Sequence, residues 1–102
     1  MVKLTYRDLD ADDFEAMHGL ATQWQVVRQL VGWPWPASPE FTKSRCKTYG
    51  GKGFVWGICL NGSLVGSVAV TGRELGYMLH PAVAGRGVMG QATFDAMSYG
   101  WP

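Results

Sequence analysis

Residues 76–96 read GYMLHPAVAGRGVMGQATFDA and decide how the chain is organised. The apolar and aromatic residues up to Leu79 predict a strand, and His80-Pro81 predicts its end because proline lacks a backbone donor. A short turn of Gly85, Arg86 and Gly87 is predicted next, followed by a helix. One face of that helix is predicted to comprise Val88, Ala92, Ala96 and Tyr99, which recur at helical spacing.

The start of this helix has no side chain suited to capping it. No Ser, Thr, Asp or Asn stands there, and no carboxylate occurs before Asp95, so the first helical N–H groups lack an obvious partner. The glycines allow close approach to the backbone, and the helix dipole and Arg86 make the place electropositive. The pattern predicts a phosphate or pyrophosphate cradle. A plain strand–helix connection remains the alternative, because G-x-G turns are common.

Several segments resemble one known family. Glu74–Leu79, Pro81 and the run Gly85-Arg86-Gly87-Val88-Met89 resemble the acyl-CoA-binding motif of the GNAT superfamily of N-acyltransferases. The closest resemblance is to the branch that acts on the N-termini of ribosomal proteins and on related amines. The family loop follows Q/R-x-x-G-x-G/A; aligned on Gly87, this chain departs from it with Ala84 at the first position and Met89 at the last. The earlier segments that agree in order are Leu4–Leu9, Val26–Arg28, Trp33–Pro36 and the strand pair around Asn61-Gly62.

The resemblance implies an acetyl-CoA-dependent N-acetyltransferase that acts on a primary amine, either a protein N-terminus or a small amine, and needs no metal. Backbone N–H groups would hold the pyrophosphate, and an N–H near Leu79 or His80 would hold the thioester carbonyl. The cofactor-binding residues expected on this basis are Leu79, His80, Gly85, Arg86, Gly87, Val88, Met89 and Gly90. Glu74 is the general-base candidate, with an exposed strand-end carboxylate near Arg73 as the alternative. Trp33 and Trp35, held between prolines, are candidates for the acceptor pocket or for plugging the core.

Composition restricts the class of protein. The 102 residues are 47% hydrophobic and 17% charged, which predicts a single globular domain with one modest core. A net charge of +1 favours neither nucleic acid nor an anionic membrane. No apolar run is long enough to span a bilayer, and Cys46 and Cys59 are interpreted as small core residues, so we expect a cytoplasmic protein.

The remaining pattern predicts an α+β fold, a mainly antiparallel sheet with helices packed on it. The expected strands are Lys3–Asp8, Gly53–Leu60, Leu64–Thr71 and Glu74–Leu79, with a type I′ hairpin at Asn61-Gly62. The expected helices run from an Asp10 cap through about Thr22, over Gln25–Val31, from a Ser38 cap to near Tyr49, and after Gly87. In the third of these strands, Leu64, Val68 and Val70 are expected on one face and Val65 and Ala69 on the other.

The resemblance covers the front two-thirds of such a domain, because GNAT-like proteins continue with a further strand, helix and strand. We therefore expect residues 1–102 to form a single GNAT-like domain without that portion, and no general acid is assigned. An open sheet edge favours association of two chains. Two alternatives to an active enzyme stay open. One is a non-catalytic dimer that binds CoA weakly, and the other is an interaction module without a ligand.

Overall fold

The computed structural model describes residues 4–28, 33–71, 74–83 and 87–100. Its strands are β1 (Leu4–Arg7), β2 (Phe54–Leu60), β3 (Ser63–Thr71) and β4 (Glu74–Leu79). Its helices are α1 (Phe14–Ala21), α2 (Trp24–Val27), α3 (Pro39–Arg45) and α4 (Val88–Gly100), and two short 3-10 turns are η1 (Ala11–Asp13) and η2 (Pro81–Val83). The four strands form one antiparallel sheet in the order β1-β2-β3-β4.

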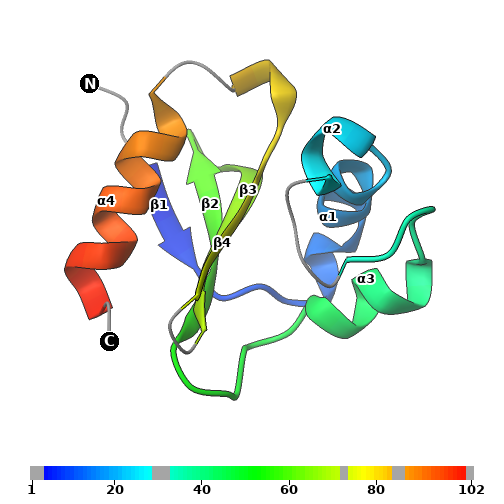
Figure 1. The fold of residues 1–102 in the computed structure, drawn as a ribbon, viewed down its shortest axis with the longest axis horizontal. Coiled ribbons are helices and arrows are strands. Elements are labelled where there is room, and N and C mark those ends of the chain that lie inside the picture. Colours follow the sequence, from blue (N-terminus) through cyan, green and yellow to red (C-terminus); the bar gives the residue numbers. More distant parts are fainter. Residues whose placement is uncertain (1–3, 29–32, 72–73, 84–86, 101–102) are drawn as a thin grey trace.

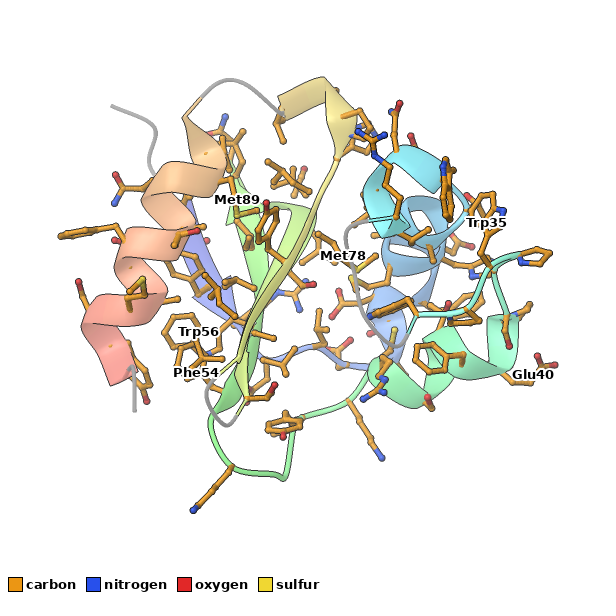
Figure 2. The ribbon with its side chains drawn as sticks, viewed as in Figure 1. Trp35, Glu40, Phe54, Trp56, Met78 and Met89 are labelled. Atoms are coloured by element: carbon orange, nitrogen blue, oxygen red, sulfur yellow. The ribbon has the colours of Figure 1, made fainter. Side chains whose placement is uncertain are left out.

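Helices cover both faces of this sheet. Figure 1 shows α4 on one face and α1, α2 and α3 together on the other. Each face has its own core, and Figure 2 shows Phe54 and Trp56 on the α4 side and Met78 on the side of α1–α3. The prediction of an α+β fold with a mainly antiparallel sheet is confirmed.

The helix starts follow the capping chemistry of the sequence. Asp10 accepts a hydrogen bond from the Asp12 N–H, and Asp13 accepts one from the Asp10 N–H, which gives a capping box ahead of α1. Ser38 accepts from the Phe41 N–H and caps α3, whose first residue is Pro39. Both predicted starts are confirmed.

The β2–β3 hairpin turns at Asn61 and Gly62. Both residues have positive φ, 53° and 84°, as a type I′ turn requires. A register shift between Ile58 and Cys59 disturbs the pairing just beyond the turn. Because of this bulge, Leu64 packs into the core on the α1–α3 side and Val65 into the core on the α4 side. The predicted grouping of Leu64 and Val65 was therefore wrong, although Val68 and Val70 share one face as expected and lie in the α4-side core.

Helix α4 packs small residues against the sheet. Val88, Ala92 and Ala96 are at most 1% exposed, as their spacing predicts. Tyr99 was expected on the same face but is 70% exposed. Its ring stands edge-on to the rings of Phe54 and Trp56 at the rim of the sheet, at centroid distances of 5.1 and 4.7 Å.

Two helices are shorter than their patterns predict. α3 ends at Arg45, because Cys46 leaves the helical region (φ −89°, ψ 66°) and places its side chain in the core on the α1–α3 side. α2 ends at Val27. The end of its predicted range, Leu30 and Val31, lies outside the described residues.

Candidate functional site

The start of α4 is open in the sense that no described side chain accepts a hydrogen bond from its first N–H groups. The Gly87 carbonyl accepts the Gln91 N–H at 3.1 Å, so Gly87 stands at the cap position, where glycine has no side chain to offer. The N–H groups of Val88, Met89 and Gly90 form the first helical turn, whose donors have no acceptor within the helix. A Cβ atom added at Gly87 or Gly90 would meet nothing within 4 Å. These residues therefore suit a phosphate; Gly85 and Arg86, predicted beside them, lie outside the described residues.

Gly87 also shows why glycine occurs at this position. Its φ is +76°, in the left-handed region that side-chain-bearing residues seldom adopt. The chain enters α4 through this conformation, so the glycine of the G-x-G turn has a backbone role as well as leaving space for a ligand.

The end of β4 determines which backbone donors face outward. The His80 N–H donates to the Val65 carbonyl at 2.8 Å, and Leu79 lies opposite Gly66. Antiparallel strands alternate hydrogen-bonded and non-hydrogen-bonded pairs, so Leu79 belongs to a pair of the second kind. Its N–H consequently points away from β3, toward the outer edge of β4, and the same alternation directs the backbone of Leu75 and Tyr77 there.

His80 is occupied by local structure. Its exposed side chain accepts the Ala82 N–H at Nδ1 (3.0 Å) and so closes the η2 turn. Its backbone N–H is bound to the Val65 carbonyl, so both the backbone and the ring of His80 make hydrogen bonds at the junction between β4 and η2. Of the two donors predicted for the thioester carbonyl, only the Leu79 N–H faces the strand edge.

A pocket of about 570 Å³ opens between the sheet and the α1–α3 side. The described residues that line it are Leu9, Met17, Trp33, Ser44, Arg45, Lys47, Tyr49, Gly50, Val55, Ser67, Ala69, Thr71, Leu75, Gly76, Tyr77 and Met78. Its volume is in the usual range for small-molecule sites. Because Leu75–Met78 of β4 form one wall, the strand edge that carries outward N–H groups lies directly beside this pocket.

The structure separates the two tryptophans predicted for the acceptor site. Trp33 lines the pocket and stands edge-on to Phe41, with ring centroids 4.9 Å apart. Trp35 is 48% exposed and packs against Trp24 at 5.3 Å; it is not among the lining residues. Figure 2 shows Trp35 on the side of the helices that is remote from the sheet. The two side chains do not come together at one site.

The Glu74 backbone lies at the rim of the same pocket. Glu74 begins β4 and pairs with Thr71, which lines the pocket. Its side chain lies outside the part of the chain that the structure describes. Ser67 also lines the pocket, from the middle of β3 opposite Met78.

Sequence reasoning missed the basic part of the pocket. Arg45 and Lys47 line it, one at the end of α3 and the other just beyond it. The sequence signal was the alternation of cations in Lys43-Ser44-Arg45-Cys46-Lys47. Cations are common near a helix C-terminus because they complement the helix dipole, so this pattern did not indicate a binding site. Only the folded chain shows that the last two cations face a cavity.

Two further findings concern the described residues. None of their helices is long and apolar enough to cross a membrane. Their His, Cys, Asp and Glu side chains form no group of three or more that could hold a metal ion.

The structure is an α+β fold in which strand β4 borders a pocket and is followed along the chain by η2 and α4. Residues 3–102 match the family model described as an acetyltransferase (GNAT) domain. The chain belongs to the GNAT family of acetyltransferases, whose members use acetyl-CoA as co-substrate. No curated protein matches the sequence.

Proposed function

We propose that the chain transfers the acetyl group of acetyl-CoA to a primary amine, either a small amine or a protein N-terminus as in the ribosomal-protein branch. One relationship carries the proposal. The open start of α4 follows the end of β4, and the outer edge of β4 runs from there past the pocket. The phosphate, the acyl arm and the acceptor amine can therefore occupy neighbouring positions, at the start of α4, along the edge of β4 and in the pocket.

The proposed pose uses backbone donors first. The pyrophosphate lies at the N–H groups of Val88, Met89 and Gly90, where each well-aligned charge-assisted hydrogen bond contributes roughly 1.5–3 kcal/mol. The amide-bearing arm of the co-substrate then lies along the outer edge of β4, as an added strand would. The Leu79 N–H is the first outward-facing donor on that path and is the proposed partner of an arm or thioester carbonyl.

The proposed reaction is direct attack of the amine on the thioester carbonyl. A C–N bond forms, the C–S bond breaks, and the electron pair leaves on the CoA sulfur as a thiolate. The amine loses a proton to a base, for which Glu74 is the candidate because its backbone begins β4 at the pocket rim. A donor to the developing oxyanion would lower the barrier further.

Calorimetric titration with acetyl-CoA tests the proposal on two variants of one position. Gly90→Glu places an anion in the open space at the start of α4, and Gly90→Gln places a neutral side chain of the same size there. We expect Gly90→Glu to weaken binding by about tenfold more than Gly90→Gln, which corresponds to roughly 1.4 kcal/mol. Equal losses in the two folded variants would contradict a pyrophosphate site at this helix start.

Release of free CoA thiol in the presence of an amine then tests turnover. Binding without thiol release, with a panel of primary amines, would favour the non-catalytic CoA-binding alternative. The single-domain organisation and the homodimer stay predictions of the sequence. Sedimentation over a range of protein concentrations tests the dimer, and a stable folded monomer at high concentration would contradict it.

A further inference from the structure

We propose that the acceptor carries a carboxylate beside its apolar body, and that Arg45 and Lys47 bind this carboxylate in the pocket. The inference rests on the proposed function and names the substrate class of the same site. The acceptor is then an amine the size of an aromatic amino acid or dipeptide.

One part of the pocket wall is apolar. Leu9, Met17 and Met78 are each at most 2% exposed, so they belong to the packed core and form a fixed surface. The ring of Trp33 completes this wall and is itself held by Phe41. A rigid apolar surface with an aromatic ring suits a planar or branched hydrocarbon group.

The charged residues that the structure describes in the pocket lining are both basic. They are Arg45 and Lys47, and none of the described lining residues is acidic. The ion pair found between described side chains, Arg7 with Asp13, lies outside the pocket. Neither Arg45 nor Lys47 is therefore neutralised by a carboxylate whose side chain the structure describes. A mostly apolar pocket with two such cations favours an anion on its ligand.

Arg45 is also held beside the aromatic part of the pocket. Its guanidinium lies over the Phe41 ring, 4.8 Å from the centroid. This cation–π contact supports the side chain, and a guanidinium has N–H donors suited to the two oxygens of a carboxylate. The same Phe41 ring holds Trp33, so the cationic and aromatic parts of the pocket share one support.

Equilibrium binding of two matched ligand pairs tests the inference without depending on catalysis. N-acetyl-L-phenylalanine and N-acetyl-L-phenylalaninamide differ by one negative charge, and neither has a reactive amine. N-acetylglycyl-L-phenylalanine and its amide vary the distance between the acetyl group and the carboxylate. By calorimetry we expect the acid of at least one pair to bind about tenfold more tightly than its amide, as charge-assisted hydrogen bonds provide.

Three single variants then locate the effect. Arg45→Gln and Lys47→Gln should each reduce the preference for the acid by about threefold or more, because each removes one cation from the pocket. Lys43→Gln is the matched control, since it removes the same charge from α3, two residues before Arg45. Lys43 lies over the Phe14 ring and not among the pocket-lining residues. The preference should be unchanged in this variant, and in the parent it should fall as ionic strength rises.

The outcomes separate this inference from the proposed function. Equal binding of acid and amide in both pairs, or an equal loss in Lys43→Gln and Lys47→Gln, would overturn the carboxylate site. Acetylation of neutral amines would then still support acetyl transfer. A preference for the acid that depends on Lys47, in a chain that releases no CoA thiol, would support the carboxylate site while the catalytic proposal fails.

Discussion

The Tyr6 hydroxyl of β1 donates a hydrogen bond to Oδ2 of Asp95 in the middle of α4. The other oxygen of this carboxylate accepts the side-chain amide of Gln91 at 2.8 Å, one helical turn earlier. The first strand therefore holds the helix whose start forms the proposed phosphate site. Because Val88, Ala92 and Ala96 pack on the same side of α4, this polar contact sets the helix position within an otherwise apolar interface.

Replacing Asp95 by alanine should destabilise the chain by about 1–2 kcal/mol, because the half-buried Tyr6 hydroxyl loses its partner. Urea denaturation measures the free energy of unfolding. Ser98→Ala on the exposed side of the same helix is the control and should change it little. Similar free energies for the two variants would mean that the Tyr6–Asp95 hydrogen bond contributes nothing.

The same contact predicts a loss of stability at alkaline pH. Burial, and then the hydrogen bond to the Asp95 carboxylate, raise the pKa of Tyr6 well above its usual value near 10. As the pH rises above about 10, the unfolded chain loses this proton while the folded chain retains it, so the unfolded state is favoured. We expect the free energy of unfolding to fall more steeply above pH 10 in the parent than in Tyr6→Phe. Parallel pH profiles for the two proteins would contradict this assignment.

The contacts of Asp13 predict the opposite pH dependence of stability, a loss at acid pH. Its carboxylate accepts two hydrogen bonds from the Arg7 guanidinium, both 2.8 Å, and one from the Asp10 N–H. The Arg7 hydrogen bonds hold the pKa of Asp13 below its usual range. Its stabilising contribution is complete above the unfolded pKa near 3.9, and it is lost as the pH falls through the lower folded pKa.

Asp13→Asn should therefore lose about 1–2 kcal/mol at pH 7, near the cost of removing a helix cap, because Arg7 is half exposed and screened by water. The difference from the parent should shrink below pH 4, and urea midpoints between pH 2 and 7 measure it. A difference that stays constant over this range would show that the charge of Asp13 has no part in it.

Local chemistry made most of the fold predictable. The Asp10 and Ser38 caps and the Asn61-Gly62 turn each follow from neighbours in sequence, and all occur where expected. The bulge at Ile58/Cys59 could not be predicted in this way. It depends on which register packs best between two helical layers, and its effect is to exchange the sides of Leu64 and Val65.

The candidate site likewise has one part that neighbours in sequence predict and another part that only tertiary packing shows. Gly87, Val88 and Gly90 were predicted because the strand, glycine turn and helix are contiguous in sequence. The structure places all three at the start of α4, and their role in binding stays a prediction. The pocket joins residues from seven segments of the chain, so Arg45 and Lys47 gave no signal beyond an ordinary basic helix end. Trp33 and Trp35 look equivalent in sequence, and only tertiary packing separates them.

Gly66 should be among the least replaceable residues of the sheet. An added Cβ would approach the Met78 carbonyl oxygen to 2.2 Å and the Leu79 Cα to 3.1 Å, and backbone atoms of a paired strand cannot move aside cheaply. Gly66→Ala should therefore cost about 2–3 kcal/mol, as other overpacking substitutions do. Gly76→Ala is the matched control on β4, since a Cβ there meets nothing within 4 Å. Thermal denaturation that finds the two variants equally stable would contradict the close approach of β3 and β4.

Trp33 and Trp35 provide a test of where the acceptor binds. If the acceptor occupies the pocket, Trp33→Leu removes part of its wall and should raise the KM for the amine by about tenfold, the effect of losing roughly 1.4 kcal/mol of apolar contact. Trp35→Leu alters an exposed ring beside Trp24 and should leave KM within about twofold of the parent. Initial rates at saturating acetyl-CoA measure both, and circular dichroism verifies that each variant is folded. A larger effect at Trp35 than at Trp33 would move the acceptor site away from the pocket and onto the outer surface of α2.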